Sequence, residues 1–255
     1  MVRIISIVNQ KGGVGKTTTA INLGAYLAHH GQRVLLIDLD PQANATSGLG
    51  VKHQELTQGI YEALIGQIPL SQIIQKTDHE RYHLAPATTS LAGANIELVN
   101  VEDREMYLDR IIKEVVDQYD YILIDNPPSL GLLTINGLTA AQEVLIPVQC
   151  EYLALEGLGQ LLETIQLVKE GLKPDLKVLG AVLTMYDSRY NLAEAVLHEL
   201  YRHFPNRIFR SVIPRNVRLA EAPSYGRPVL THDADSRGAR AYERLTKEIL
   251  ANNNL

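Results

Sequence analysis

Glycine, lysine and threonine are concentrated in one stretch near the N-terminus, Asn9-Gln10-Lys11-Gly12-Gly13-Val14-Gly15-Lys16-Thr17-Thr18. Glycines allow successive backbone N–H groups to turn toward one point, and the start of a following helix adds a positive dipole there. Such a loop can bind phosphate. Lys16 is then placed to reach β- and γ-phosphates, and the Thr17 hydroxyl to bind a magnesium ion between them. The stretch therefore predicts a site for a magnesium nucleotide.

The loop departs from the usual G-x-x-x-x-G-K-[ST] pattern. Gln10 stands where that pattern has its first glycine, and Lys11 adds a second lysine inside the loop. A glycine-rich turn that binds nothing is the alternative for a single fingerprint of this kind. The two lysines, the pair of threonines, the apolar run before the loop and the helical pattern after it favour phosphate binding.

Acidic residues follow two apolar runs farther along the chain. Asp38 and Asp40 come after one run, and Asp125 ends another. In an open α/β sheet, ligands bind beyond the carboxyl ends of the strands, so we expect all three carboxylates to face the phosphates. Asp125 is placed to hold magnesium through water. The alternative for Asp38 and Asp40 is a pair of acids that cap a turn before Pro41.

Apolar runs alternate with helical patterns, which predicts an α/β fold with one doubly wound, mostly parallel sheet and helices on both faces. Strands are expected at residues 4–8, 33–37, 82–86, 120–125, 143–148, 177–184 and 207–213. Helices are expected at residues 17–30, 59–64, 70–75, 90–99, 103–119 and 235–251, with others ending near 171 and 203 and a short one opening at 214–218. Because no linker or repeat interrupts the pattern, we expect a single domain over residues 1–255.

The composition is that of an ordinary folded protein, with 45% hydrophobic and 21% charged residues. Cys150 is the only cysteine, which excludes an intrachain disulfide. We expect a cytoplasmic protein, because the sequence lacks a signal peptide and an apolar stretch of the roughly 18 residues that span a membrane. The net charge is −5, but from Tyr186 onward eleven Lys and Arg residues stand against eight acids. The last part of the chain is therefore basic and the rest is acidic.

Three motifs resemble those of the ParA/MinD superfamily of ATPases: K-G-G-V-G-K-T-T resembles its deviant Walker A loop, and D-x-D-P-Q at 38–42 and D-x-P-P-S at 125–129 resemble its switch segments. The resemblance covers essentially the whole chain and implies a P-loop NTPase fold with ATP and Mg²⁺ as ligands. It also implies a homodimer in the ATP state, in which Lys11 reaches the phosphates bound by the other subunit. Asp40 matches the residue that positions or activates the attacking water.

The resemblance implies three groups of site residues. Catalytic roles fall to Lys11, Lys16 and Asp40, and magnesium is held by Thr17, Asp40 and Asp125. The implied nucleotide contacts are Lys11, Gly12, Gly13, Val14, Gly15, Lys16, Thr17, Thr18, Pro214 and Asn216. Similar chains usually have a cysteine where this sequence has Asn126, a departure expected beside the magnesium and the γ-phosphate.

Within the superfamily, the chain is most similar to the short ParA/Soj-type partition ATPases. That likeness implies an ATP dimer that binds double-stranded DNA nonspecifically, a slow ATPase stimulated by a ParB-type activator protein, and association with the nucleoid, for either a chromosome or a plasmid. Arg189, Arg215 and Arg218 are the expected DNA contacts. The alternative is that these arginines are solvated or pair with Asp187 and Glu221.

Two other functions remain as alternatives. A MinD-like ATPase cycles on a membrane and needs a basic amphipathic C-terminal helix, whereas residues 242–255 have balanced charges, so we expect no membrane partner. The other alternative is a nitrogenase-reductase-like cluster carrier or a dethiobiotin-synthetase-like enzyme. The cluster needs at least two cysteines, and Cys150 is alone; the synthetase stays open but gains no support from a nucleophile paired with a base.

Overall fold

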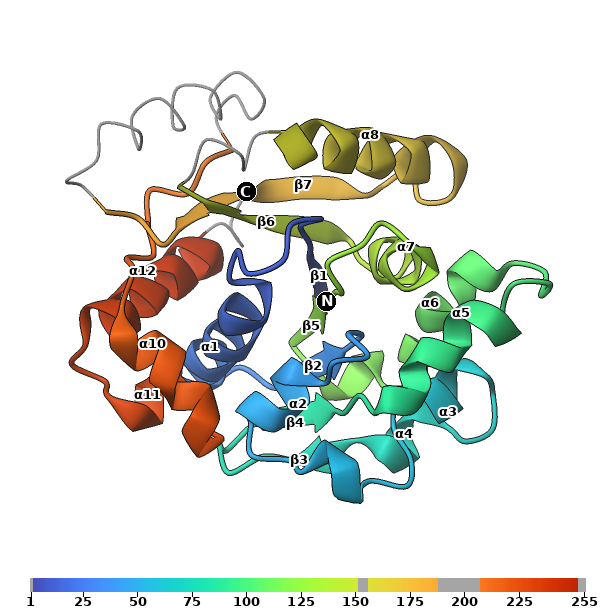
Figure 1. Cartoon of the computed structure of the whole chain (residues 1–255), viewed down its shortest axis with the longest axis horizontal. Helices are drawn as coiled ribbons and strands as arrows, with labels where there is room; N and C mark the ends of the chain where they lie inside the picture. The colour runs from blue at the N-terminus through green and yellow to red at the C-terminus, as the bar shows by residue number, and fades with distance from the viewer. Residues whose placement is uncertain (1, 151–155, 188–206, 252–255) are drawn as a thin grey trace.

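A computed structural model describes residues 2–150, 156–187 and 207–251. Among these residues, a seven-stranded sheet has the order β3-β4-β2-β5-β1-β6-β7 (Figure 1). The strands are β1 (Arg3–Ile7), β2 (Val34–Asp38), β3 (Gln75–Lys76), β4 (Tyr82–Ala85), β5 (Tyr121–Asp125), β6 (Glu143–Gln149) and β7 (Lys177–Thr184). Only the pairing of β3 with β4 is antiparallel among them. The expected mostly parallel sheet is confirmed.

Helices cover both faces of this sheet (Figure 1). On one face lie α1 (Lys16–His29), α10 (Val217–Glu221), α11 (Val229–His232) and α12 (Arg237–Ala251). On the other lie α3 (Ile60–Leu64), α4 (Leu70–Ile73), α5 (Ala94–Glu97), α6 (Tyr107–Ile112), α7 (Leu132–Thr139) and α8 (Glu156–Gly171). The short helix α2 (Asn44–Gly48) follows β2. Within the described ranges, no helix is long and apolar enough to span a bilayer.

Strand β2 shows how one segment serves both faces, because successive side chains of a strand point in opposite directions. Leu35 and Ile37 belong to the core under α3 to α8, and Val34 and Leu36 to the core under α1 and α12. All of β2 is buried. A strand covered on both faces reads as a continuous apolar run, which is why the sequence pattern identified it.

The parallel register brings the carboxyl ends of the central strands to one edge. Asp125 pairs in register with Ile7 of β1 and with Asp38 of β2. The loop after β1 and the acidic ends of β2 and β5 therefore meet at this edge.

Helix α1 is held by buried polar contacts with distant segments. The Tyr82 hydroxyl donates to the carbonyls of Ala20 and Ile21, at 3.3 and 3.2 Å, and lies so close to Gly24 that a Cβ there would overlap the phenol. On the other side, the hydroxyls of Thr19 and Tyr242 are 3.1 Å apart and share a hydrogen bond that joins α1 to α12. These contacts fix the helix that begins at the glycine loop.

The expected strand at 207–213 is wrong. The segment makes only isolated bridges within the described residues, Ala181 with Ile208 and Tyr186 with Pro214. The N–H groups of Arg210 and Ser211 donate instead to the carboxylate of Glu248 on α12, at 2.8 and 3.0 Å. Because the Glu248 side chain accepts these backbone N–H groups, they are not available for continuous strand pairing with β7. The expected helix ending near 203 lies outside the described residues.

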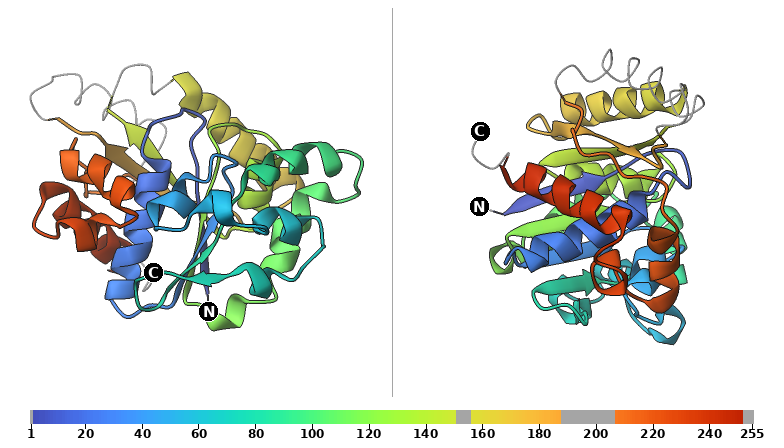
Figure 2. Two further views of the ribbon diagram at one scale, coloured as in Figure 1. Left: turned by 60° about the horizontal axis from the view of Figure 1, so that its bottom comes forward. Right: turned by 90° about the vertical axis from the view of Figure 1, so that its left-hand side faces the viewer.

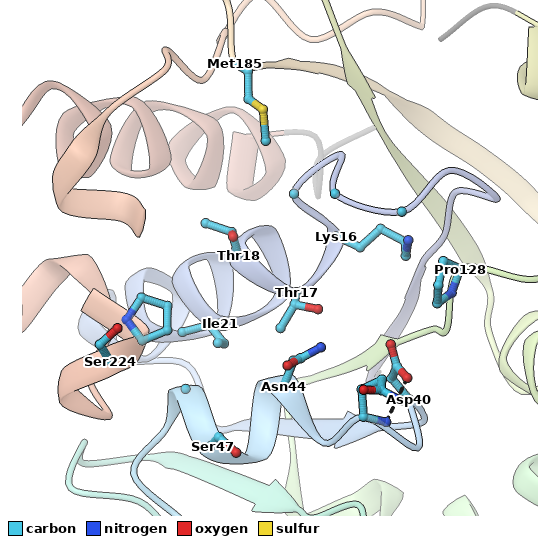
Figure 3. Close-up of a pocket in the computed structure, with 16 residues that line it drawn as sticks. Lys16, Thr17, Thr18, Ile21, Asp40, Asn44, Ser47, Pro128, Met185 and Ser224 are labelled. Atoms are coloured by element: carbon cyan, nitrogen blue, oxygen red, sulfur yellow. Dashed lines mark hydrogen bonds between the residues drawn. The ribbon is translucent and has the colours of Figure 1, made fainter. Parts of the chain in front are cut away.

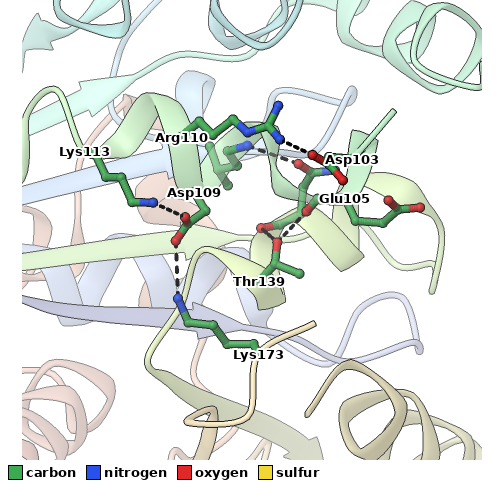
Figure 4. A network of polar contacts seen from close by, with 9 residues as sticks. Asp103, Glu105, Asp109, Arg110, Lys113, Thr139 and Lys173 are labelled. Carbon is green, nitrogen blue, oxygen red and sulfur yellow. Dashed lines mark hydrogen bonds and ion pairs between the residues drawn. The ribbon is translucent and has the colours of Figure 1, made fainter. Parts of the chain in front are cut away.

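The expected helix at 103–119 is also wrong, because it is broken into a 3₁₀ turn at Arg104–Met106, α6, and a second 3₁₀ turn at Val116–Gln118. Side chains of α7 bond backbone groups of this segment: Asn136 accepts from Leu108 N–H, and Thr139 donates to the Glu105 carbonyl (Figure 4). Ion pairs around it, including Asp109 with Lys113 and Lys173, hold the segment against its neighbours. The helix expected at 90–99 is likewise a 3₁₀ turn, Thr89–Gly93, followed by α5.

Candidate functional site

The loop between β1 and α1 has the conformation that its glycines allow. Gly13 and Gly15 have φ of +73° and +90°, in the left-handed region that glycine adopts without strain. A Cβ on Gly13 would meet nothing within 4 Å, so conformation and not space requires glycine there. The buried Val14 between them accepts a hydrogen bond on its carbonyl from the Thr184 hydroxyl, at 2.8 Å. This bond anchors the loop to the end of β7.

Two side chains fix the path of the loop from inside. Asn9 donates to the Pro147 carbonyl at 2.7 Å, and its own carbonyl accepts from Lys11 N–H at 3.0 Å. The Lys16 ammonium donates to the Lys11 carbonyl at 3.1 Å, and Lys16 is only 6% exposed. Burial lowers the pKa of Lys16, while the nearby carboxylates of Asp125 and Asp40 act to raise it. The lysine is thus a buried cation beside acidic groups, at the start of a helix.

Asp38 has a structural role at the edge of the site. Its carboxylate accepts hydrogen bonds from Thr46 N–H at 2.8 Å, from the Thr46 hydroxyl at 2.7 Å and from Asp40 N–H at 3.1 Å. Burial raises the pKa of Asp38 to about 6, although these hydrogen bonds oppose the shift. Like Asp125, Asp38 is fully buried and does not line the cavity described below, and the expectation that it faces the phosphates stays a prediction. Its bonds hold α2 against the sheet.

Asp125 is a buried carboxylate at the end of β5. Both of its oxygens are inaccessible to solvent and have no hydrogen-bond partner among the described residues. Burial and the neighbouring Asp38 raise its pKa well above the ordinary value, whereas the Thr17 hydroxyl and Lys16 act to lower it. A buried, unpartnered carboxylate is costly by itself and fits a position beside a cation.

The arrangement suits a magnesium ion that is only partly bound by protein. No cluster of three or more His, Cys, Asp or Glu side chains in the described ranges could hold a metal alone. Magnesium usually keeps several waters and binds through one or two protein groups plus substrate phosphates. Thr17, Asp40 and Asp125 supply protein oxygens of the required kind at the end of the glycine loop.

A cavity of about 540 Å³ opens over the loop (Figure 3). Figure 3 shows Lys16, Asp40 and Pro128 around one end of it, with Thr17 between them and Asn44. The lining residues come from five segments: Gly12, Gly13, Gly15, Lys16, Thr17, Thr18, Ile21, Asp40, Gln42, Asn44, Ser47, Gly48, Pro128, Met185, Pro223 and Ser224. The cavity therefore combines the positive end of α1 with one acidic side chain.

A second cavity, of about 180 Å³, adjoins the first and shares Gly15, Thr18 and Met185 with it. Its other lining residues are Thr184, Ile213, Pro214, Arg215, Asn216, Leu219, Ala220 and Tyr242. Asn216 also caps α10, because its side-chain oxygen accepts from Leu219 N–H at 3.3 Å. The smaller cavity has the more apolar lining and suits a flat ring better than a phosphate.

The structure brings most of the expected nucleotide residues together. Seven line the larger cavity: Gly12, Gly13, Gly15, Lys16, Thr17, Thr18 and Asp40. Pro214 and Asn216 line the smaller one, and Val14 and Asp125 are buried beneath the loop. Lys11 contributes its backbone to the loop, but its side chain is not part of either lining. Their individual roles stay predictions.

Two of the three expected DNA contacts lie among the described residues. Arg215 is exposed and lines the smaller cavity. Arg218 pairs with Glu221 at 2.9 Å and with Asp233 at 3.2 Å, so the alternative expectation of a pair with Glu221 is confirmed. Arg189 lies outside the described residues.

Asn126 is turned away from the site. Its amide donates to the Ser6 hydroxyl at 2.9 Å and to the carbonyls of Ile7 and Ile124, at 3.0 and 3.2 Å. Its side-chain oxygen faces Gly137 so closely that a Cβ there would overlap it. The departure from the usual cysteine is therefore accommodated in the core and does not alter the cavity lining.

The resemblance placed Gln42 and Asn44 in a switch segment, but the sequence patterns missed the part of the cavity formed by Ser47, Met185, Pro223 and Ser224. Helix α2 has only five residues, too few to show a helical period, and Pro223 and Ser224 lie far along the chain from the loop. For Ser47, the available signal was its place directly after the polar residues that follow the two aspartates.

Comparisons with known proteins agree with this site. A family model described as an AAA domain matches residues 2–178. The sporulation initiation inhibitor protein Soj of Bacillus subtilis is 54% identical over 99% of this chain and 100% of its own length. The chromosome partitioning protein ParA of Myxococcus xanthus is 53% identical over 97% of this chain and 88% of its own length.

A solved structure is also similar to this chain over its whole length. It is the cobyrinic acid a,c-diamide synthase of Mycobacterium smegmatis with a bound ATP analogue and magnesium, with a TM-score of 0.88, 39% identity, and coverage of 100% of this chain and 96% of that one. Three findings point to the same family: the order of strands in the sheet, the glycine loop with its buried lysine, and the full-length similarity to Soj and ParA. This chain belongs to the ParA/Soj family of chromosome-partitioning ATPases, within the ParA/MinD superfamily.

Proposed function

We propose that this chain is an ATPase for partition whose ATP-bound form dimerises and binds double-stranded DNA nonspecifically, and whose release from DNA follows hydrolysis stimulated by a ParB-type partner. The proposal is carried by one observation: the glycine loop and the Lys16 ammonium line one cavity, and the Asp125 carboxylate, which has no hydrogen-bond partner among the described residues, is buried beneath the same loop. That charge arrangement complements a magnesium triphosphate. The full-length relatives named Soj and ParA support partition as its use.

Within one subunit, the loop N–H groups and Lys16 bind the phosphates, and Thr17 and Asp125 hold the magnesium shell. A bound magnesium ion would neutralise negative charge on the phosphates. The base occupies the smaller cavity beside Pro214 and Asn216. The phosphates thus correspond to the larger cavity over the loop, and the base to the smaller cavity beside α10.

Asp40 is placed to position the water that attacks the γ-phosphate. It is 6% exposed and lines the cavity, and one of its oxygens accepts from Gln42 N–H at 3.0 Å. That bond orients the carboxylate and leaves its other oxygen to hold a water molecule. Turnover by the isolated chain should be slow, because positioning and charge stabilisation stay incomplete without the second subunit and the activator.

Lys11 completes the partner's site in the proposed dimer. This role is inferred from the resemblance of the loop to the deviant Walker A loop, in which Lys11 is the second lysine. The backbone of Lys11 belongs to the loop through the bonds with Asn9 and Lys16. Lys11→Ala should therefore keep measurable nucleotide affinity and lose ATP-dependent dimerisation.

Size-exclusion chromatography with ATP and with ADP tests the switch, with Lys11→Ala as the matched variant. Fluorescence anisotropy on two unrelated duplexes then measures DNA binding by the protein in each peak, and so tests whether the dimer binds DNA without regard to its sequence. ATP should produce a dimer that binds both duplexes equally, and ADP should not. A wild-type protein that stays monomeric with ATP, or a Lys11→Ala variant that dimerises normally, would contradict the proposed switch.

Two other uses of the same site are less well supported. The name of the Mycobacterium smegmatis structure suggests an amide synthase, but that protein is 39% identical to this chain, against 54% and 53% for Soj and ParA. A MinD-like membrane cycle needs an apolar helix face turned to lipid, whereas the apolar face of α12 is buried on α1. Pelleting with anionic vesicles and ATP separates the membrane use from DNA binding. Localisation to the nucleoid follows from the DNA-binding proposal.

A further inference from the structure

Helix α12 carries basic side chains along one side, here called the basic face: Arg237, Arg240, Arg244 and Lys247, all exposed. Their spacing of three, four and three residues places them within about a quarter of the helix circumference, over roughly 15 Å. The opposite side, with Tyr242, Leu245 and Ile249, is buried in the core under α1. Figure 2 (right) shows α12 in the outer layer of this side of the molecule. The basic face therefore points outward from a fixed helix.

Three of these residues are cations without a partner. Among the described residues, no acidic side chain forms an ion pair with Arg237, Arg240 or Arg244. Several other arginines are paired, such as Arg33 with Asp120 at 2.8 Å, and Arg218 with two acids. A charged group that is already paired must give up that pair before it can bind a phosphate, and an unpaired one need not.

The acids of α12 do not neutralise the basic face. Glu243 pairs with Lys247 at 2.5 Å, and Glu248 accepts the N–H groups of Arg210 and Ser211. Helix α12 therefore keeps a net charge of +2, from four cations and two acids, and its three arginines remain unpaired among the described residues. Double-stranded DNA carries one negative charge per about 1.7 Å of its axis, so a face of this length lies opposite roughly nine phosphate charges.

We propose that the basic face of α12 binds the phosphate backbone of double-stranded DNA and contributes more to affinity than Arg218 does. This inference rests on the proposed function, in which the ATP dimer binds DNA. An anionic membrane is the less suitable occupant, because the apolar side of α12 is buried and none of the large exposed apolar side chains found in the described residues lies on this helix.

The helix is also positioned by the nucleotide-binding half of the molecule. Tyr242 lines the smaller cavity, and its hydroxyl shares a hydrogen bond with the hydroxyl of Thr19. Thr19 lies in the first turn of α1, two residues after Thr17. Asn22 of α1 joins the Thr18 carbonyl to Val229 N–H, at 2.8 and 2.7 Å, and so fixes the segment before α12. The basic face is thus held on a rigid support that includes the residues around the nucleotide.

The test compares two triple variants by fluorescence anisotropy on two unrelated duplexes, with ATP, at several salt concentrations. Arg237→Ala/Arg240→Ala/Arg244→Ala removes the unpaired cations. Lys76→Ala/Arg110→Ala/Lys113→Ala removes the same charge from exposed residues of β3, of α6 and of the position directly after α6, and serves as the control. Both variants must still dimerise with ATP in size-exclusion chromatography and keep the basal ATPase rate. Pelleting with anionic vesicles is run in parallel.

Each lost phosphate contact reduces the slope of log affinity against log salt by about 0.9, and costs roughly eightfold in affinity near 0.1 M salt. The α12 variant should therefore bind both duplexes at least about 100-fold more weakly, with a slope lower by roughly 2.7 or more, and the control should change much less. Arg240→Ala alone should weaken binding more than Arg218→Ala.

Equal binding by the two triple variants would overturn this inference and leave the DNA step of the proposed function intact. A wild-type dimer that binds no DNA would overturn both. Binding to vesicles in place of DNA, lost in the α12 variant, would overturn the choice of DNA as the occupant.

Discussion

Replacing Asp125 by asparagine should make the nucleotide-free protein more stable and remove most of its response to magnesium ATP. Both Asp125 oxygens are buried without a hydrogen-bond partner, and Asp38 stands beside it in register on the next strand. Burial and this like charge are the causes of its raised pKa. Asparagine keeps the shape of the side chain and removes the charge, so the cost of holding the carboxylate there disappears.

The size of the effect follows from the burial. A buried polar group without a partner costs about 1–3 kcal/mol, and since the asparagine amide also needs partners, we expect a net gain of roughly 1–2 kcal/mol. For a chain of this size, each kcal/mol moves Tm by about 2–4 °C, so Tm should rise by roughly 2–8 °C. Magnesium ATP at a hundredfold excess over its Kd stabilises a binding protein by about 2.7 kcal/mol. Most of that gain should be lost in the variant.

Differential scanning fluorimetry, with EDTA and with magnesium ATP, measures both effects. The matched control is Asp120→Asn, just before the same strand, where hydrogen bonds from Arg33 lower the pKa of Asp120. That pair is partly exposed, so the control should lose at most about 1 kcal/mol and keep its response to nucleotide. A fall in the Tm of Asp125→Asn without ligand, or an undiminished nucleotide response, would refute the reasoning.

Three further outcomes are expected. The stability advantage of Asp125→Asn should shrink in chemical denaturation as the pH is lowered from neutrality, because a carboxyl group whose folded-state pKa is raised takes up its proton more readily in the folded protein and so stabilises the wild type at lower pH; a constant advantage would contradict this. Gly24→Ala should overlap Tyr82 and cost roughly 1–3 kcal/mol, whereas Gly159→Ala, with nothing near its Cβ, should be neutral or stabilising in the same thermal scan. Asp40→Ala should bind ATP and dimerise but release phosphate slowly, and wild-type turnover in a phosphate assay would move the role elsewhere.

The glycine loop and the parallel sheet could be predicted because their determinants are local. The loop chemistry lies in ten consecutive residues, and its two left-handed positions are both glycine. Strands buried on both faces appear in the sequence as apolar runs, as in β2 and β5. Sequence reasoning therefore identified the part of the site that the β1 to α1 connection and the strand ends form.

The parts that could not be predicted depend on contacts between distant residues. Glu248 takes N–H groups from Arg210 and Ser211, across more than thirty residues, and no local pattern in 207–213 reports that competition. Asn136 interrupts the segment at 103–119 in the same way. Asp38 was expected at the phosphates because it ends a central strand of the sheet. In the structure, its carboxylate accepts hydrogen bonds from the N–H and the hydroxyl of Thr46.

Asn126 and Gly137 together limit the order in which related sequences can change. Alanine at position 137 would overlap the Asn126 side chain, so it cannot appear while asparagine stands at 126. The smaller cysteine of similar chains would remove that obstacle, and position 137 could then drift to alanine. Once it has done so, asparagine can no longer return to 126 without a prior reversion to glycine. A lineage that carries this asparagine should therefore keep glycine at 137, and the two positions should vary as a pair across the family.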